Sequence, residues 1–379
     1  MERIQVGVLF GGKSAEHEVS IVSASSIIKN LNSQKYDITP IYIDVHGKWH
    51  YLELIAVQDL SNVVREVRMI KGRILENKCD IAISSNIGNP DKRLDVIFPI
   101  IHGTLGEDGA VQGVFELLNI PYVGSNVLSS AITMDKEITK KLLQQHGISM
   151  TPFISIKEHE YTPSNQDEII KRIFSGVSFP MFVKPANCGS SIGINKVKNE
   201  AELKGAISDA FKYDQKILVE QGVAAREIEV SVLENIEDYS TPIVSHPAEL
   251  IPNDEFYSYK AKYIMENGAR FEIPANLPAS TADLIRKTAG EVFKILECNC
   301  LARVDFFLEQ GTDRVFFNEI NTLPGFTEIS LYPKLLGHYG IGYSKLLDML
   351  IDLAQNKHKT RQNKITNSVE ILSTIQQLK

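Results

Sequence analysis

The chain has 379 residues, and this length predicts two or three domains rather than one simple core. Hydrophobic residues make up 43% of it and charged residues 23%, which is ordinary for a soluble globular protein. The net charge of −7 argues against a nucleic-acid surface, and the only basic block is a modest one at residues 357–361. No apolar run approaches the roughly 20 residues that span a bilayer, and residues 4–10 are too short and too interrupted for a signal peptide. We therefore expect a cytoplasmic protein that binds neither nucleic acid nor membrane.

The first third of the chain alternates strand and helix patterns. Strands are predicted at residues 4–10, 36–44, 94–101 and 121–123, and helices at 16–31 and 110–118. This order predicts a parallel sheet with helices on its faces, where ligands bind beyond the carboxyl ends of the strands. The segments GGKSAEHE, from residue 11, and HGTLGEDG, from residue 102, fall at such ends. The two loops should therefore face one cleft.

Two further units follow, and a tail ends the chain. Helices are predicted at residues 136–146 and 201–211, and strands at 181–184, 194–197 and 217–220, around a glycine-rich loop. The third unit opens on REIEVSVLE, whose alternation indicates a largely antiparallel sheet with one solvent-exposed face. The expected fold class is α/β, with α+β in the C-terminal part. The predicted boundaries are 1–133, 134–222 and 223–355, then a polar tail at 356–379 whose end could form a helix.

The four cysteines do not follow a zinc-binding spacing. Only Cys298 and Cys300 lie close together, and Cys79 and Cys188 stand apart. In a reducing compartment the default is a free, buried thiol, so we expect free cysteines.

Two neighbouring strand patterns carry oxygen ligands of the kind that Mg²⁺ prefers. Residues 304–308 and 315–320 form apolar runs joined by a Gly-Thr-Asp turn, with Asp305 on the first and Glu319 and Asn321 on the second. An isolated acidic pair is more often solvated charge at a sheet edge. Here the turn that follows places Gly325 and its backbone N–H beside the carboxylates, and two carboxylates plus an amide suit magnesium with nucleotide phosphates.

Residues 7–14, GVLFGGKS, match the phosphate-loop pattern formally but not physically. The apolar strand continues through the three residues after Gly7, so a loop built there would expose them. No strand ending in a metal-binding aspartate follows at a suitable place. We therefore predict that this segment is not a phosphate loop.

A second phosphate-binding candidate is the loop at residues 186–193, ANCGSSIG. Its glycines and serines offer backbone donors and hydroxyls, while Lys184 precedes it and Lys136 begins a helix upstream. By itself such a loop could equally be a plain hairpin. With the lysines upstream and the carboxylates downstream, we predict a lid over nucleotide phosphates.

Three other positions carry polar groups that could face this cleft. Glu220 and Glu227 end and begin strands, and carboxylates suit the adenine amine and ribose hydroxyls rather than phosphates; they could also be solvated strand-end acids. Arg303 lies two residues before Asp305, so both point to one face of their strand. A fixed positive charge there suits a developing oxyanion.

An ordered set of motifs resembles the D-alanine–D-alanine ligases, a family with the ATP-grasp fold. The motifs span about nine tenths of the chain, a far more specific signal than any one of them. In chain order they are GGKSAEHEVS, HGTLGEDG, MDK, VKPANCGSSIG, EQGVAAREIEV, FYSYKAKY and RVDFFLEQGTDRVFFNEINTLPGFTEIS. Ser258 and Lys260 depart from the family pattern FYDYEAKY, where acidic residues are common. The chemistry is left intact by these departures.

The resemblance implies a function and a set of site residues. It implies ATP-dependent joining of two D-alanines through an acyl phosphate, for peptidoglycan precursors. The partners are D-alanine and ATP, the cofactor is Mg²⁺ or Mn²⁺, with two ions expected, and the assembly is a homodimer. The implied ATP-binding residues are Lys136, Lys184, Ser191, Glu220 for the adenine amine, Glu227 for the ribose, and Phe256. The implied metal ligands are Asp305, Glu319 and Asn321.

The remaining implied roles concern the two amino acids. Glu16 takes the first ammonium, and Ser190 links the lid to it together with Tyr263. The other implied residues are His102 at the first amino-acid site, Arg303 and Gly325 at the oxyanion, Lys262 and Ser330 at the second carboxylate, and Leu331 beside the second side chain. Two alternatives stay open: another ATP-grasp ligase, which need not share GGKSAEHE or FYSYKAKY, and a non-catalytic nucleotide-binding module, which would tend to lose a metal ligand or Arg303.

Overall fold

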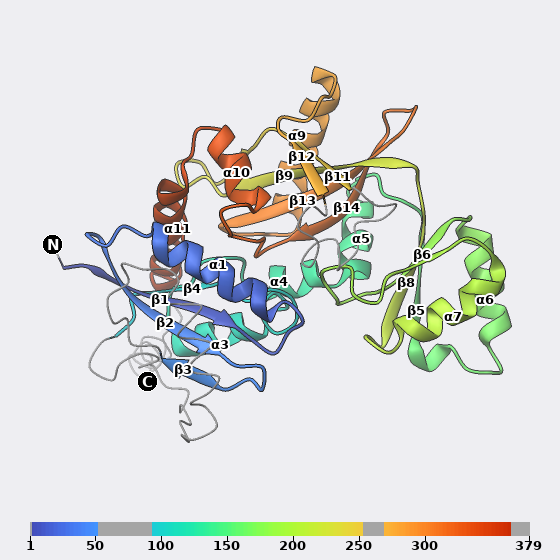
Figure 1. The fold of residues 1–379 in the computed structure, drawn as a ribbon, viewed down its shortest axis with the longest axis horizontal. Helices are drawn as coiled ribbons and strands as arrows, with labels where there is room; N and C mark the ends of the chain where they lie inside the picture. The colour runs from blue at the N-terminus through green and yellow to red at the C-terminus, as the bar shows by residue number, and fades with distance from the viewer. Residues whose placement is uncertain (1, 52–92, 253–268, 365–379) are drawn as a thin grey trace, which may run out of the picture.

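The computed structural model describes residues 2–51, 93–252 and 269–364, which form three units. Figure 1 shows the N-terminal unit in blue to cyan, the central unit in green and the C-terminal unit in yellow to red. The helix that could end the tail lies outside the described residues, as do these predicted positions: Cys79, Phe256, Ser258, Lys260, Lys262 and Tyr263.

The N-terminal unit is a mostly parallel sheet, as its alternating pattern predicts. Its elements are β1 (Ile4–Gly11), α1 (His17–Asn30), β2 (Tyr36–Ile43), β3 (Trp49–Tyr51), β4 (Val96–Pro99), α3 (Ala110–Leu118) and α4 (Val127–Met134). The order is β3-β2-β1-β4, and β1 pairs in parallel with β2 and β4. Gly7 lies inside β1, so GVLFGGKS does not form a phosphate loop. The sequence prediction missed the antiparallel edge strand β3, and the strand expected at 121–123 is only a bridge between Ile97 and Tyr122.

The central unit is a four-stranded antiparallel sheet in the order β5-β8-β6-β7. Its elements are α5 (Lys136–Gln145), β5 (Phe153–Lys157), the 3₁₀ turn η1 (Glu158–Glu160), α6 (Gln166–Gly176), β6 (Met181–Pro185), β7 (Asn195–Val197), α7 (Glu200–Ala210) and β8 (Lys216–Gln221). Buried isoleucines of α6 and α7 pack with the strands in one apolar cluster. Asp135 caps α5 by accepting from the N–H groups of Glu137 and Ile138, which fixes Lys136 in the first turn. β5 and α6 are absent from the sequence prediction.

The C-terminal unit is an antiparallel sheet in the order β12-β11-β9-β13-β14, with β10 beside β9, as predicted. Its elements are β9 (Ala225–Leu233), β10 (Ile243–Val244), β11 (Ala248–Pro252), β12 (Ala269–Glu272), α9 (Ala279–Ile295), β13 (Leu301–Glu309), β14 (Val315–Asn321), α10 (Leu331–His338) and α11 (Tyr343–Gln362). α9 packs on one face of the sheet. The prediction of an exposed opposite face is wrong for β9, because Glu229 and Ser231 are buried. There α10 covers the strand: the Ser231 hydroxyl donates to the Tyr332 carbonyl at 3.2 Å.

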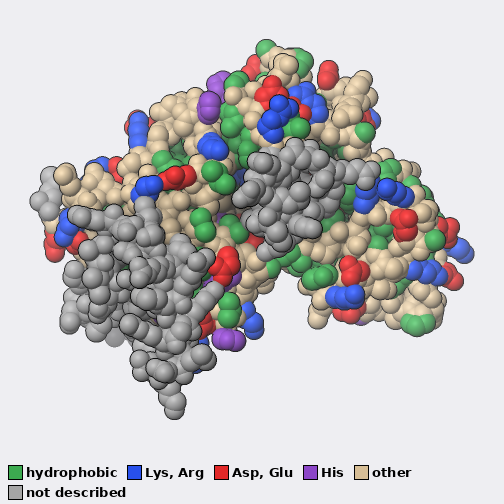
Figure 2. Space-filling view, viewed as in Figure 1, with side chains coloured by type: hydrophobic (Ala, Val, Ile, Leu, Met, Phe, Trp, Pro, Cys, Tyr) green, Lys and Arg blue, Asp and Glu red, His purple; other side chains and the backbone are tan. Residues whose placement is uncertain are grey.

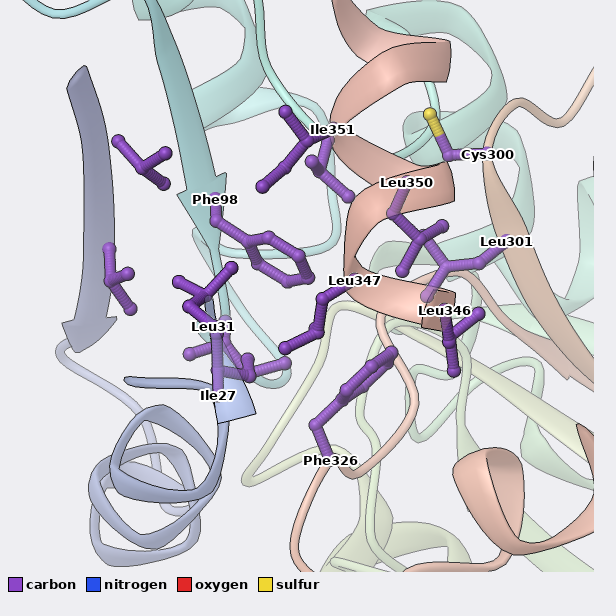
Figure 3. Packing of buried hydrophobic residues seen from close by; sticks show 14 of the residues in the cluster. Ile27, Leu31, Phe98, Cys300, Leu301, Phe326, Leu346, Leu347, Leu350 and Ile351 are labelled. Atoms are coloured by element: carbon purple, nitrogen blue, oxygen red, sulfur yellow. The ribbon is translucent and has the colours of Figure 1, made fainter. Parts of the chain in front are cut away.

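Helix α11 joins the N-terminal and C-terminal units in one hydrophobic core. Leu347 and Leu350 of this helix lie in a cluster with Ile27 of α1 and Phe98 of β4 (Figure 3). α11 runs to Gln362, so the predicted tail begins inside a helix. The sequence-based boundary at 355 fell short because no proline or glycine marks the helix end there.

The basic block at residues 357–361 makes internal contacts. Lys357 Nζ donates to Asn299 Oδ1 at 2.7 Å and lies 5.5 Å from the centre of the Tyr122 ring. Arg361 forms an ion pair with Glu116 of α3. On the face that Figure 2 shows, acidic and basic side chains are interspersed. Among the described helices, none combines the length and the apolarity needed to cross a bilayer.

Candidate active site

Two loops of different units meet at Glu16. The Ser190 hydroxyl donates a hydrogen bond to Glu16 Oε1 across 174 residues of sequence, the contact that the resemblance implies. The Glu16 carboxylate is closely enclosed. A Cβ at Gly103 would lie 2.7 Å from Glu16 Oε2, and a Cβ at Gly189 would lie 3.1 Å from it. These two glycines therefore make room for the acid, and a side chain at Gly103 would also be strained because its φ is +75°.

His102, in the second N-terminal loop, carries a buried imidazole. Ser14 Oγ donates to the His102 carbonyl at 2.7 Å and so joins the two N-terminal loops. His102 Nδ1 is 2.9 Å from the Leu323 carbonyl oxygen, which can only accept, so Nδ1 carries the proton. Nε2 lies 3.2 Å from Ser23 Oγ and accepts from that hydroxyl. Burial lowers the pKa of His102, so the ring keeps this tautomer at neutral pH.

Glu107 is a site residue that the sequence interpretation did not single out, although it stands in HGTLGEDG. Its Oε2 accepts from the Gly103 N–H at 2.7 Å, and its Oε1 accepts from the Leu323 N–H at 3.0 Å. Burial, together with the negative charge of Glu16, raises the pKa of Glu107 to about 8. Glu107 could have been found from the sequence, because it is an acidic residue in a loop that follows a predicted parallel strand, where ligands bind.

Arg303 on β13 organises the carboxylates of the neighbouring strands. It binds Asp305 with two hydrogen bonds, Nε to Oδ1 at 2.8 Å and Nη2 to Oδ2 at 2.7 Å, which confirms that both residues share one face. Its Nε also lies 2.9 Å from Glu229 Oε2. Burial opposes the charge, but Asp305 and Glu229 outweigh it and raise the pKa of Arg303, which therefore stays cationic. Glu229 was missed, although it alternates with two buried apolar residues.

The predicted metal ligands lie at neighbouring positions of the sheet. Asp305 is paired with Glu319 across β13 and β14, next to a register shift after Asp305. Asn321 Nδ2 donates to Asp305 Oδ2 at 3.1 Å. A carboxylate that accepts the fork of Arg303 keeps lone pairs for a metal ion. The set offers two carboxylates and an amide oxygen, which fits a hard cation that takes its other ligands from phosphates and water. Within the described residues, no cluster of three or more His, Cys, Asp or Glu could hold a metal ion.

A pocket joins the metal-ligand candidates to the glycine-rich loop. Its wall includes Lys136 and Gly189 of the central unit, Glu319 and Asn321 of β14, and Glu107 of the N-terminal unit. The structure therefore brings together one predicted phosphate-binding lysine, two predicted metal ligands and the glycine-rich loop. Such convergence of polar groups in one pocket is typical of a ligand site.

The two predicted phosphate-binding lysines have protein partners in this structure. Lys136 Nζ donates to the Cys188 carbonyl in the lid at 2.7 Å. Lys184 Nζ lies 2.8 Å from Glu220 Oε2, inside the protein. Ser191, like Ser190, adopts the left-handed conformation, with φ of 59° and 51° respectively. The lid backbone is therefore sharply turned between its glycines.

Glu220 lies between two buried lysines, one of which the sequence interpretation missed. Lys140 Nζ, on the helix that starts with Lys136, is 3.3 Å from Glu220 Oε1. Burial lowers the pKa of Lys140 to about 8, and Lys184 adds to this effect while Glu220 opposes it. Burial raises the pKa of Glu220, but the two lysines outweigh it and hold that pKa below its usual value. One carboxylate thus faces two ammonium groups at the end of β8.

The turn after β14 holds the remaining predicted residues. A Cβ at Gly325 would lie 2.9 Å from Ser330 Oγ, so the two residues are in close contact. Ser330 Oγ accepts from the Thr327 N–H at 2.9 Å. Leu331 is buried in a small apolar cluster with Leu335 and Ala248 rather than lining the pocket. Glu227 is half-buried on β9, paired with Phe307 and Leu250 of the adjacent strands. Each of the three cysteines in the described residues is free.

Comparisons with known proteins identify the class and then the family. The solved structures that resemble this chain over nearly its whole length include two ligases. The D-alanine-D-alanine ligase from Coxiella burnetii has a TM-score of 0.80 and 33% identity, covering 100% of both chains. The VanG D-Ala:D-Ser ligase from Enterococcus faecalis has a TM-score of 0.79 and 34% identity, covering 93% of this chain and 100% of that one.

Sequence comparisons narrow the class. The model of the D-ala D-ala ligase N-terminus matches residues 5–125, and that of the C-terminus matches residues 142–352. The D-alanine--D-alanine ligase of Caldicellulosiruptor bescii is 47% identical over 365 residues, covering 96% of this chain and 98% of that protein. The D-alanine--D-alanine ligase A of Bradyrhizobium diazoefficiens is 43% identical, with coverages of 96% and 98%. The chain belongs to the D-alanine–D-alanine ligase family.

Proposed function

We propose that this protein joins two D-alanines to form D-alanyl-D-alanine and uses ATP as the energy source. The dipeptide is then used to make peptidoglycan precursors. One observation carries the proposal beyond family membership: Ser190 of the glycine-rich loop is hydrogen bonded to Glu16 of the N-terminal loop. This contact couples the loop suited to phosphates with the acid suited to an ammonium group. A nucleotide-binding module without catalysis has no need of that coupling.

The residues of the pocket suit a two-step reaction. The first D-alanine carboxylate attacks the terminal phosphate of ATP to give an acyl phosphate and ADP, and the amine of the second D-alanine then displaces phosphate. Glu16 holds the first ammonium, while Arg303 and the Gly325 N–H lie where negative charge develops on the carbonyl oxygen. Such a path needs alignment, charge neutralisation and exclusion of water rather than a protein nucleophile.

The metal contributes electrostatically in this proposal. Asp305, Glu319 and Asn321 would hold Mg²⁺ or Mn²⁺, with two ions implied by the family resemblance, and the metal would neutralise phosphate charge. In this proposal Lys136, Lys184 and Ser191 bind the ATP phosphates. Glu220 binds the adenine amine, and Glu227 binds the ribose. Phe256, Tyr263 and Lys262 are assigned to the site by family resemblance alone. The proposal that the protein is a homodimer also rests only on that resemblance.

The division into domains is also part of the proposal. Residues 1–133 form the substrate domain, and residues 134–222 and 223–355 form the two ATP-grasp domains around the nucleotide. The separate sheets of the three units support these boundaries.

The second substrate requires a direct test, because one structural relative is a D-Ala:D-Ser ligase. A buried serine hydroxyl without a partner costs roughly 1–3 kcal/mol, which is about tenfold or more in selectivity. The sequence-based argument placed Leu331 beside the second side chain, whereas its side chain packs with Leu335 and Ala248. The preference for D-alanine therefore rests on family membership and not on Leu331.

The experiment is a competition with equal D-alanine, D-serine and D-lactate. The purified protein is supplied with ATP and Mg²⁺, ADP release is followed, and products are identified by mass spectrometry. We expect D-alanyl-D-alanine as the main product. Domination by D-Ala-D-Ser or D-Ala-D-lactate would overturn the second-substrate assignment, and absence of any D-alanine-dependent ADP release would overturn the function.

A further inference from the structure

Side chains of the N-terminal unit hold the turn at residues 323–326 from both sides. The Leu323 N–H donates to Glu107 Oε1 at 3.0 Å, and the Leu323 carbonyl accepts from His102 Nδ1 at 2.9 Å. Both polar groups of one residue are thus bound by a loop that lies more than 200 positions away in sequence, the Glu107 contact spanning 216. Two such bonds fix the orientation of the peptide groups as well as their position.

A third contact fixes the other end of the turn. The Phe326 N–H donates to Ser23 Oγ at 3.4 Å, and Ser23 Oγ lies 3.2 Å from His102 Nε2. Because Nδ1 of the neutral imidazole is the donor, Nε2 accepts, and the serine proton points to it. Donors and acceptors therefore alternate from Phe326 through Ser23 and His102 to Leu323, and they bracket Gly325.

Glu107 also connects this turn to the floor of the Glu16 site. Its second oxygen accepts from the Gly103 N–H at 2.7 Å, and Gly103 is the residue whose missing side chain leaves room for the Glu16 carboxylate. The Glu107 carboxyl group therefore sets the distance between the loop that holds Glu16 and the turn that holds Gly325.

We propose that Glu107, His102 and Ser23 are positioning residues that fix the Gly325 N–H relative to the first amino acid. The inference rests on the proposed function, because it assigns Gly325 to the developing oxyanion. In that reaction the ammonium is held from the N-terminal unit and the carbonyl oxygen from the C-terminal unit. The alignment of the two depends on bonds between units, and these are the bonds that the structure supplies.

The test compares two carboxylates of the same loop. Glu107→Gln keeps one acceptor oxygen and replaces the other with an NH₂ group, which cannot accept from a backbone N–H, so one of the two bonds is lost. Asp108→Asn is the matched control: Asp108 accepts from the N–H groups of Leu105 and Ala110 only within its own loop, at 2.8 and 3.0 Å.

The measurements are kcat and KM by ADP release, the Kd of a non-hydrolysable ATP analogue, and thermal stability. A displaced oxyanion donor costs about 10-fold to 100-fold in rate. We expect Glu107→Gln to lower kcat by that factor while the Kd of the analogue changes less than about twofold, because the nucleotide contacts are on other elements. Asp108→Asn should stay within about threefold of wild type in every parameter.

Several outcomes would overturn the inference. An equal loss in both variants would show a general effect on the loop, and a Glu107→Gln loss confined to KM would show direct substrate binding. If Glu107→Gln does not fold, Ser23→Ala decides, because it removes the hydroxyl between Phe326 and His102; an unchanged kcat in that variant refutes the inference. Wild-type activity with D-alanine in the same assay tests the proposed function separately from the ratios between variants.

Discussion

Glu220→Gln should strongly destabilise the central unit, because the Glu220 carboxylate balances two buried ammonium groups. Glu220 is 3% exposed and lies 2.8 Å from Lys184 and 3.3 Å from Lys140. Removing one partner of a buried ion pair costs about 3–5 kcal/mol, since the other charge stays desolvated. The amide keeps the size of the side chain and a carbonyl oxygen, so the change isolates the charge.

The part of this cost that falls on Lys140 can be bounded. A pKa lowered from 10.5 to about 8 means that charged Lys140 already costs the wild type about 3 kcal/mol. Losing its proton at pH 7 adds only the one pKa unit between about 8 and 7, so the variant can lose at most about 1 kcal/mol more at this residue. The remainder of the 3–5 kcal/mol falls on Lys184.

The same numbers set a pH dependence. Between pH 8 and 10.5 the unfolded chain holds the Lys140 proton and the folded protein does not, so stability rises with pH in this window. At pH 9 Lys140 is largely neutral in wild type and variant alike. The difference in stability between them should therefore shrink by about 1 kcal/mol from pH 7 to pH 9.

Hydrogen-exchange mass spectrometry measures the local opening free energy in peptides from α5 and β8. The control is Glu291→Gln, the same change at an exposed pair with Lys287 that is worth about 0.3–0.5 kcal/mol. Lys140→Met should lower the opening free energy less than Glu220→Gln does, because it leaves the ion pair of Glu220 and Lys184 balanced. Protection in Glu220→Gln equal to that of Glu291→Gln would refute the charge balance. A loss that is the same at pH 7 and pH 9 would refute the role of Lys140.

Two further predictions concern the chemistry. Glu319→Gln removes a charge from the metal-ligand set and should lower turnover by about 100-fold or more in a protein that melts like wild type, and near-normal ADP release from the folded variant would contradict the metal assignment. Ser190→Ala removes the hydroxyl bound to Glu16 and should raise KM for D-alanine about tenfold, with a smaller change in KM for ATP. A change in the KM for ATP alone would show that Ser190 binds the ATP phosphates instead of positioning Glu16.

Local patterns in the sequence predicted most of the described strands but fewer than half of the described helices, since α4, α6, α9, α10 and α11 were not predicted. β1, α1, β2, α3 and α5 begin and end within one or two residues of their predicted limits, because buried apolar runs and caps such as Asp135 are visible locally. β5 and α6 were not predicted, although the buried isoleucines of α6 at residues 169, 170 and 173 follow helical spacing. The buried outer face of β9 was misjudged because its cover, α10, begins about 100 positions later in the sequence, at Leu331.

In the candidate site, the sequence predicted residues that lie in motifs. It missed several residues that connect one motif to another. The period of two in a strand correctly placed Arg303 and Asp305 on one face, and the family resemblance correctly implied the contact between Ser190 and Glu16. The period of side chains along a strand shows on which face of the sheet a side chain lies. It does not show which residue that side chain contacts. Glu229, Lys140 and Glu107 were missed because each acts on a group that another segment supplies, 216 residues away in the case of Glu107.

This difference has a physical origin in how the site is assembled. Glu16, the glycine-rich loop and the strands β13 and β14 belong to three units, each with its own sheet. Their relative positions depend on a few hydrogen bonds and charges between units, together with the core that α11 shares with α1 and β4. A reaction between two small amino acids provides little binding energy to correct a misplaced group, so these contacts have to set the alignment before substrate arrives. Residues such as Glu107 and His102, which bind backbone groups of Leu323, are therefore expected to affect kcat more than nucleotide affinity.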